Sequence, residues 1–176
     1  MKFPPLTAIL TPSFRGAPAL TYLTRRNLIL AATLGSAAML LAAWGFQYLG
    51  GLAPCKLCYW QRYPYMAAVP VGLLALALPG IALPLLGAAT AAGTSAVGLY
   101  HTGVERGWWQ GPDTCTSGPI GGLSPDQLLD QIMAAPLVRC DEIAWEFLRL
   151  SMASWNALAA LGLMGLWLAA ARRSRA

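Results

Sequence analysis

Charged residues are scarce in this sequence. Only 11% of its 176 residues are Asp, Glu, Lys or Arg, and 57% are hydrophobic. Soluble domains carry about 25% charged residues, so the deficit excludes an ordinary soluble domain and indicates an integral membrane protein. Histidine and cysteine are also rare, with one and four residues. The length allows a single domain with only a few membrane spans.

The net charge of +5 does not indicate a nucleic-acid-binding protein, because the excess lies at the two ends of the chain. The terminal segments hold seven cations and no acid: Lys2, Arg15, Arg25, Arg26, Arg172, Arg173 and Arg175. All seven acids lie between Glu105 and Glu146. We therefore expect no nucleic-acid partner and a lipid bilayer as the surroundings.

Four apolar stretches approach the length of about 20 residues that a transmembrane helix needs. They cover residues 28–49, 57–78, 81–100 and 152–171. The sequence thus predicts an all-α integral membrane protein, a four-transmembrane-helix bundle over residues 28–171. Residues 50–56 and 101–151 would form a short first and a long second loop on one side. Residues 1–27 and 172–176 would be tails on the other side.

The distribution of cations predicts the orientation of the bundle. Cytoplasmic segments of membrane proteins are enriched in Lys and Arg, so both cation-rich tails are expected in the cytoplasm. The two cysteine pairs, Cys55/Cys58 and Cys115/Cys140, then lie on the outer side. In a bacterium this is the periplasmic side of the inner membrane, an oxidising compartment where disulfides persist.

Cys55-Lys56-Leu57-Cys58 is a Cys-x-x-Cys motif at the predicted start of the second span. Helical spacing places Cys55 and Cys58 on one face, with Arg62 one turn further along. The positive end of the helix and a nearby cation both lower a thiol pKa, which favours the reactive thiolate. The motif therefore predicts a redox-active dithiol. A structural disulfide or half of a zinc site is the alternative.

Two cysteine pairs on one side of a membrane suit a relay, in which one disulfide oxidises the other by thiolate attack. Cys115 lies in a stretch rich in Gly and Pro, so we expect it to be exposed and to meet a protein partner. A static Cys115–Cys140 disulfide is the alternative. The expected electron acceptor is a lipid-soluble quinone, ubiquinone or menaquinone, and no metal is expected.

Two further residues are candidates for contact with the quinone. Arg62 keeps its charge and donates several hydrogen bonds, although it could instead anchor the helix at lipid phosphates. His101 could contact the quinone, carry a proton or simply lie at the membrane interface.

A short helix is expected inside the long loop. Ser124-Pro125-Asp126-Gln127 has the pattern of a capping box with Pro at the first helical position. The apolar residues Leu128, Leu129, Ile132 and Met133 then fall on one side. This helix would lie on the membrane surface or pack against the spans.

These features together resemble the disulfide bond formation protein B (DsbB) family. The resemblance covers about residues 28–171 and rests on four spans, the Cys-x-x-Cys, Arg62 and the loop cysteines. The segments 100–105 (Tyr-His-Thr-Gly-Val-Glu) and 140–142 (Cys-Asp-Glu) are similar to a subgroup of that family. The alternatives are a four-span protein of the vitamin K epoxide reductase type and a non-enzymatic protein with two structural disulfides. In the former, the Cys-x-x-Cys is expected on a late span.

The resemblance implies a membrane oxidoreductase that reoxidises a soluble, DsbA-like thioredoxin-fold protein and passes the electrons to quinone. It implies that Cys115 receives electrons from this partner and pairs with Cys140. It also implies that Cys55 exchanges with the loop pair, and that Cys58 faces the quinone beside Arg62.

Overall fold

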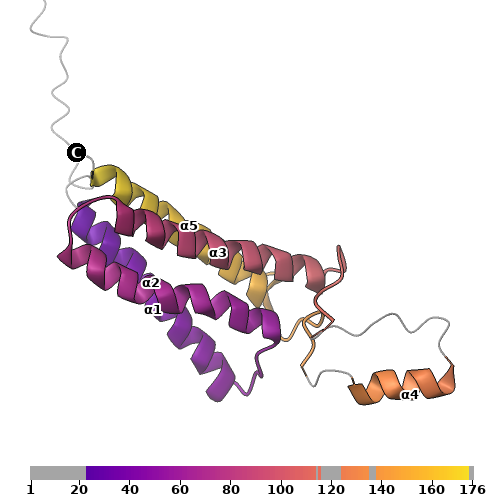
Figure 1. Cartoon of the computed structure of the whole chain (residues 1–176). Coiled ribbons are helices and arrows are strands. Elements are labelled where there is room, and N and C mark those ends of the chain that lie inside the picture. The colour runs from indigo at the N-terminus through magenta and orange to yellow at the C-terminus, as the bar shows by residue number, and fades with distance from the viewer. Residues whose placement is uncertain (1–22, 114, 116–123, 135–137, 175–176) are drawn as a thin grey trace, which may run out of the picture.

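The computed structural model describes residues 23–113, 115, 124–134 and 138–174 of the chain (Figure 1). Within these residues there are four long helices, one short helix and one small hairpin. They are α1 (Arg25–Tyr48), α2 (Lys56–Ala77), α3 (Ala82–Glu105), α4 (Pro125–Ala134), β1 (Glu146–Phe147), β2 (Leu150–Ser151) and α5 (Met152–Arg173). Any structure in residues 1–22 of the predicted tail lies outside this description.

The four long helices pack side by side as a closed ring. Helix α1 contacts α2 and α5, and α3 contacts the same two helices. Three of the four, α1, α3 and α5, are long and apolar enough to cross a membrane. Helix α2 is less apolar because its first turns carry Gln61, Arg62 and several aromatic residues. The predicted helical membrane fold is thus confirmed, whereas a membrane crossing by α2 stays a prediction.

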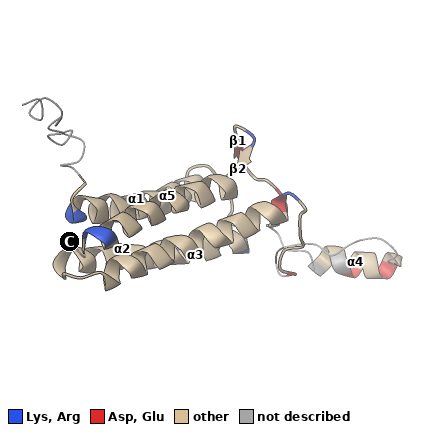
Figure 2. Ribbon diagram, turned by 90° about the horizontal axis from the view of Figure 1, so that it is seen from above, with Lys and Arg blue, Asp and Glu red and all other residues tan. Residues whose placement is uncertain are grey.

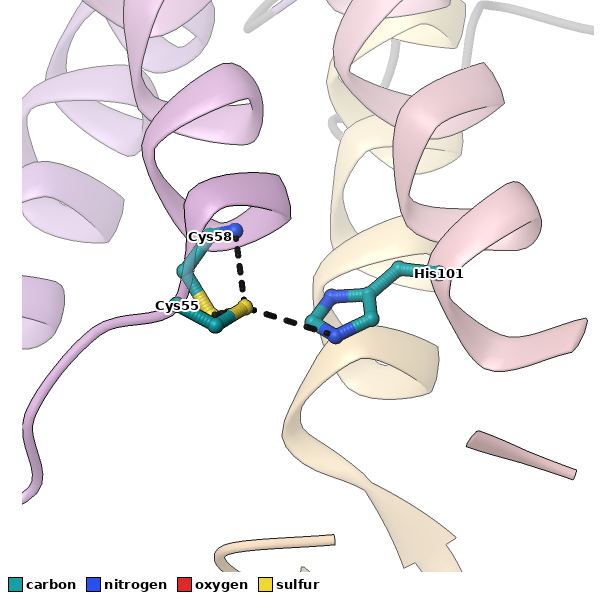
Figure 3. A group of neighbouring side chains, drawn as sticks. All are labelled: Cys55, Cys58 and His101. Atoms are coloured by element: carbon teal, nitrogen blue, oxygen red, sulfur yellow. Dashed lines mark hydrogen bonds between the residues drawn. The ribbon is translucent and has the colours of Figure 1, made fainter. Parts of the chain in front are cut away.

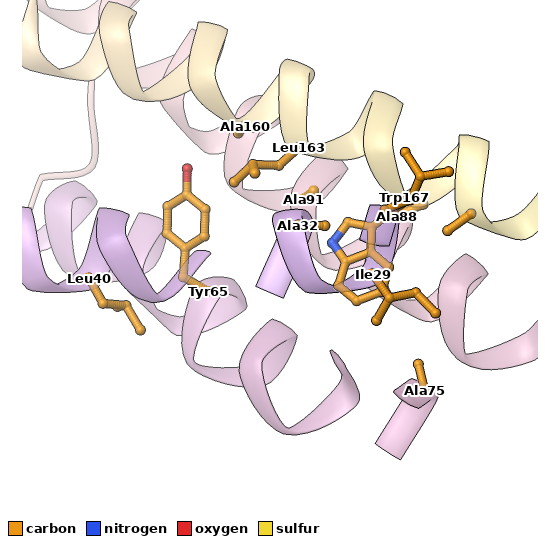
Figure 4. Packing of buried hydrophobic residues seen from close by; sticks show 12 residues of the cluster. Ile29, Ala32, Leu40, Tyr65, Ala75, Ala88, Ala91, Ala160, Leu163 and Trp167 are labelled. Atoms are coloured by element: carbon orange, nitrogen blue, oxygen red, sulfur yellow. The ribbon is translucent and has the colours of Figure 1, made fainter. Parts of the chain in front are cut away.

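Small residues allow the helices to approach one another around a large buried side chain. Trp167 of α5 is fully buried in the central apolar cluster, together with Ile29 and Ala88 (Figure 4). Gly87 of α3 lies against the Trp167 indole so closely that a Cβ atom there would overlap the ring. This contact fixes the distance between α3 and α5.

One arginine links the start of the first long helix to the end of the last. The Arg25 Nε donates to Ser174 Oγ at 2.8 Å. Its Nη2 donates to the carbonyl oxygens of Leu78 and Gly80, at 3.0 and 3.2 Å, in the turn between α2 and α3. Arg25 therefore joins three separate parts of the chain at one end of the bundle.

Charges are unevenly distributed between the two ends of the bundle (Figure 2). Arg25, Arg26, Arg172 and Arg173 gather where α1 begins and α5 ends. The acidic residues lie at the opposite end of α3 and in the segments beyond it. This separation supports the predicted orientation without testing it.

Helix α3 continues about one turn beyond the predicted end of the third span at residue 100. It ends in a Schellman motif, in which the Trp108 N–H donates to the Gly103 carbonyl and the Gly107 N–H to the Val104 carbonyl. Gly107 has the positive φ of 68° that this motif needs. His101 therefore lies in the last turns of a helix and not in the loop predicted for residues 101–151.

Helix α4 begins with the predicted capping box. The Ser124 hydroxyl accepts from the Gln127 N–H at 3.3 Å, and the Gln127 side chain accepts from the Ser124 N–H at 3.0 Å. The four apolar residues of its predicted apolar side are all exposed, and α4 lies beyond the end of the bundle in both views (Figures 1 and 2). It does not pack on the long helices here, so its expected membrane contact stays a prediction.

The hairpin of β1 and β2 was not anticipated from the sequence. Its turn residues, Leu148 and Arg149, have positive φ angles of 50° and 62°. Such turns usually contain Asn or Gly, and neither residue is present at these two positions, so no sequence pattern predicts the hairpin. The hairpin brings the chain back to Ser151, whose hydroxyl caps α5 by accepting from the Ser154 N–H.

Candidate redox site

Cys55 and Cys58 lie at the N-terminus of α2 (Figure 3). Cys55 is the N-cap residue, and its sulfur accepts from the Cys58 N–H at 3.3 Å. The two sulfur atoms are 3.1 Å apart and are not bonded to each other. The pair is therefore a dithiol in which the Cys55 sulfur accepts a hydrogen bond from the helix N-terminus.

These contacts make Cys55 the more acidic thiol. The hydrogen bond with the Cys58 thiol lowers the pKa of Cys55 well below the usual thiol value. Burial opposes this shift, and the hydrogen bond with His101 reinforces it. Because the thiolate is the species that attacks disulfides, Cys55 is suited to exchange with another cysteine pair.

Cys115 and Cys140 form a disulfide with a Cα–Cα distance of 5.3 Å. The Cys140 N–H also donates to the Cys115 carbonyl at 2.7 Å. Both cysteines are buried in one apolar cluster with Cys55, Leu57 and Val104. The two cysteine pairs, which are far apart in the sequence, therefore meet above the N-terminus of α2.

The expectation that Cys115 is exposed is wrong for this structure. Only 1% of its surface is accessible, and Cys140 is fully buried. Gly and Pro around Cys115 predict an open loop, but the disulfide draws its sulfur into the cluster with Cys55. A partner protein could reach Cys115 only if this part of the loop moved.

His101 lies between the two cysteine pairs. Its Nε2 atom is 3.6 Å from the Cys55 sulfur and 3.2 Å from the Cys140 carbonyl oxygen. On the other side of the ring, Nδ1 is 2.8 Å from the Gln61 side-chain nitrogen. His101 is therefore a neighbour of both pairs rather than an isolated interfacial residue.

An apolar cavity of about 510 Å³ adjoins the dithiol. Its walls come from α1, α2, α3 and α5 and from the segments before α2 and before the hairpin, and both Cys55 and Cys58 line it. A row of aromatic rings borders it from α1 to α5, through Phe46, Trp145, Phe147 and Trp155. The cavity could hold an apolar ring compound next to the sulfur atoms.

Arg62 lines the same cavity and is held against α1. Its Nη1 donates to the Gln47 side-chain oxygen at 2.6 Å and its Nη2 to the Ala43 carbonyl at 3.3 Å. The guanidinium also lies over the Tyr59 ring, 5.3 Å from its centre. These contacts hold Arg62 at the cavity wall, where it can donate to a carbonyl oxygen.

Comparisons with known proteins agree with this architecture. The family model described as "Disulfide bond formation protein DsbB" matches residues 25–170. The chain belongs to the DsbB family. Proteins named "Disulfide bond formation protein B" are 34% identical in Methylococcus capsulatus and 35% in Dechloromonas aromatica. These matches cover 82% and 76% of this chain, and 92% and 85% of those relatives. No solved structure matches the chain significantly.

Membership of the DsbB family gives the general character of the site. Together with the three apolar helices, it makes the chain a bacterial membrane oxidoreductase of disulfide bond formation. The vitamin K epoxide reductase type is set aside, in agreement with a Cys-x-x-Cys that opens the second long helix. The separate roles of the four cysteines, Arg62 and His101 remain predictions.

Sequence reasoning did not identify several polar residues beside His101. Gln61 and Asn156 are joined by a hydrogen bond of 2.6 Å, and Asn156 also accepts from the Tyr65 hydroxyl at 3.0 Å. The Glu105 side chain is 3.8 Å from His101 Nε2. Polar residues inside membrane helices are often functional, and this signal could have singled out Gln61 and Asn156.

The cluster also offers three atoms that could ligate a metal ion. The sulfurs of Cys55 and Cys58 and a ring nitrogen of His101 lie within 4.8 Å of one another. A structural zinc site in a protein normally has four ligands, and the described part of the chain adds no fourth residue to this group. We assign no metal to it.

Proposed function

We propose that this protein reoxidises a soluble, DsbA-like dithiol protein in the periplasm and passes the electrons to a membrane quinone. The observation that carries the proposal is the meeting of two cysteine pairs beside an apolar cavity. Membership of the DsbB family supports it. In this proposal the protein lies in the inner membrane, with both termini cytoplasmic and the cysteines periplasmic.

The first exchange takes place at the loop disulfide. A thiolate of the partner attacks the Cys115 sulfur, the Cys115–Cys140 bond breaks, and Cys140 leaves as a thiolate. The partner's second thiolate then attacks its own sulfur in the mixed disulfide and releases Cys115. The partner departs oxidised, and the loop pair has gained two electrons.

The second exchange moves these electrons to α2. A loop thiolate attacks Cys55 in a Cys55–Cys58 disulfide, and Cys58 leaves as a thiolate. The remaining loop thiolate attacks the mixed disulfide, which releases Cys55 and restores the Cys115–Cys140 bond. The product has a loop disulfide and a reduced Cys55/Cys58 pair, which is the arrangement in this structure. Cys55 suits this exchange because its thiolate is stabilised.

The cavity fits a quinone, either ubiquinone or menaquinone. Its aromatic and aliphatic walls suit an apolar ring, while Arg62 and His101 supply the polar groups. A quinone bound there would accept two electrons and two protons from Cys55 and Cys58, which would form the Cys55–Cys58 disulfide again. Cys58 and Arg62 line the cavity together, so Cys58 can face the ring while Arg62 binds a ring oxygen.

Quinone consumption by the purified protein tests this proposal. With a dithiol such as dithiothreitol as electron donor, the wild-type protein should reduce quinone catalytically. Cys58→Ser should abolish turnover, because no Cys55–Cys58 disulfide can form. The matched control Thr90→Ser, on α3 away from the cysteines, should retain it. Absence of turnover in the wild type would favour two structural disulfides, and normal turnover in Cys58→Ser would refute the assigned role.

The partner's point of attack can be mapped separately. A DsbA-like protein that lacks its second cysteine cannot resolve its mixed disulfide. Both loop cysteines are buried while they are joined. We expect the partner to form a reductant-sensitive complex with the wild-type protein through Cys115, the cysteine that lies in the stretch rich in Gly and Pro. Peptide mapping of a linkage to Cys140 or Cys55 would show that the order of exchange is wrong.

A further inference from the structure

The hydrogen bonds around Gln61 identify which nitrogen of His101 carries the proton. The Gln61 side-chain nitrogen lies 3.3 Å from the Leu57 carbonyl oxygen and 2.8 Å from His101 Nδ1. A carbonyl oxygen can only accept, so the atom facing Leu57 is the amide nitrogen. His101 Nδ1 then accepts from Gln61, and the proton of the neutral ring lies on Nε2.

The opposite side of the His101 ring leads to the same assignment. Nε2 lies 3.2 Å from the Cys140 carbonyl oxygen, which also can only accept. The Cys55 sulfur is 3.6 Å from the same nitrogen. An N–H group at Nε2 can donate to both the Cys140 carbonyl oxygen and the Cys55 sulfur. An unprotonated Nε2 would instead place its lone pair against the Cys140 carbonyl oxygen.

Two further residues fix the orientation of Gln61. The Asn156 side-chain nitrogen on α5 donates to the Gln61 side-chain oxygen at 2.6 Å. The Tyr65 hydroxyl donates to the Asn156 oxygen at 3.0 Å. Gln61 itself is buried, with 6% of its surface exposed. Rotation of the Gln61 amide would break its bonds to Asn156, Leu57 and His101 together.

We propose that Gln61 is a positioning residue that holds His101 as the Nε2–H tautomer and so directs a neutral N–H donor at Cys55. A donor of this kind stabilises the Cys55 thiolate without requiring a protonated imidazole. The same N–H group contacts the Cys140 backbone, so it orients Cys55 toward the loop disulfide. The importance of Gln61 for turnover rests on the proposed function, but the assignment of the His101 tautomer does not.

The tautomer can be measured directly because the chain contains a single histidine. In the full-length protein labelled with ¹⁵N-histidine, nitrogen chemical shifts distinguish a protonated from a bare ring nitrogen. We expect the wild type to show Nε2 protonated and Nδ1 bare above the pH at which the ring loses its charge. A spectrum with the proton on Nδ1 would overturn the proposal, whatever any variant does.

Substitution of Gln61 tests its role in positioning. Gln61→Met preserves the approximate shape but cannot donate to Nδ1, so we expect a mixture of both tautomers. Gln47→Met is the matched control, because Gln47 bonds to Arg62 and not to His101. A pure Nε2–H spectrum in Gln61→Met would overturn the proposal. If Gln61→Met does not fold, Asn156→Leu, which removes the anchor of the Gln61 oxygen, replaces it with the same expectation.

The reactivity of Cys55 provides a second measurement. In a Cys58→Ser background with the loop disulfide intact, Cys55 is the remaining free thiol, and its alkylation can be followed against pH. The ionisable groups near it are His101 and Glu105 on α3, with Arg62, Arg139 and Glu142 also lining the cavity. These groups are unchanged in Gln61→Met.

Adding Gln61→Met should move the half-maximal alkylation rate to higher pH. We expect a shift of about one pH unit, and hence an approximately tenfold lower rate on the ascending part of the profile. An unchanged profile would refute the action of Gln61 on Cys55. Neither the histidine ¹⁵N spectrum nor the pH profile of Cys55 alkylation depends on quinone reduction. Failure of the quinone assay would therefore contradict the proposed function without contradicting the role of Gln61.

Discussion

At the scale of single residues, Arg62 has the most easily tested role. Its guanidinium is held by Gln47 and the Ala43 carbonyl at the wall of the cavity. Arg62→Gln should raise the apparent KM for quinone about tenfold or more, since a hydrogen bond from a charged group contributes about 1.5–3 kcal/mol. Steady-state quinone reduction by purified protein measures this effect.

The variant Gln47→Ala provides a control for the Arg62 measurement. Gln47→Ala removes one contact of Arg62 but keeps the positive charge, so its KM should change less than that of Arg62→Gln. An unchanged KM in Arg62→Gln would mean that Arg62 serves only to anchor the helix at the membrane surface.

Sequence reasoning located the cysteines correctly but not their immediate surroundings. The Cys-x-x-Cys spacing predicts that Cys55 and Cys58 lie together at a helix start, because that geometry is local. The contact between His101 and Gln61 joins positions 40 residues apart. It depends on how α2 and α3 rotate against each other, and no local pattern encodes that rotation.

At the scale of helices, the packing of α3 on α5 depends on the absence of a side chain at Gly87. Gly87→Ala should destabilise the protein by about 1–3 kcal/mol, because the new methyl group overlaps the buried Trp167 ring. Gly162→Ala on α5 is the matched control, since its Cβ would meet no atom within 4 Å. Unfolding in detergent, followed by circular dichroism, compares the two; equal stability would contradict the packing described.

Helix α4 should hold the loop at the membrane surface. Its residues Leu129 and Ile132 are 59% and 61% exposed, so they are free to enter the lipid interface. The double variant Leu129→Asp/Ile132→Asp should lower turnover with a protein partner at least tenfold. Each side chain loses about 1.5–3 kcal/mol of burial, and about 1.4 kcal/mol already corresponds to a factor of ten. Asp130→Asn, on the same helix, should have little effect.

Turnover with a small dithiol helps to interpret the α4 result. Normal turnover of the double variant with both the protein partner and dithiothreitol would show that α4 is not needed. The capping box of α4 was predictable because it lies within four residues. The position of α4 relative to the bundle was not predictable, because it depends on the whole loop and not on a local sequence pattern.

At the scale of the whole molecule, the charge separation predicts the orientation in the membrane. In a cysteine-free background, a cysteine at the exposed position Asp130 (Asp130→Cys) should react with a membrane-impermeant maleimide in intact cells, and Ser13→Cys should not. Both should react after permeabilisation. Labelling of Ser13→Cys alone in intact cells would reverse the topology and place the redox site on the wrong side for a periplasmic partner.

The contacts of Arg25 have a consequence for biosynthesis. This residue lies at the beginning of the first long helix, yet its partner Ser174 follows the last one, 149 positions later. The hydrogen bond between Arg25 and Ser174 can therefore form only after α5 has been synthesised and inserted into the bilayer. A chain that ends just before residue 174 would therefore insert all four long helices but lack the hydrogen bond that joins Arg25 to the segment after α5.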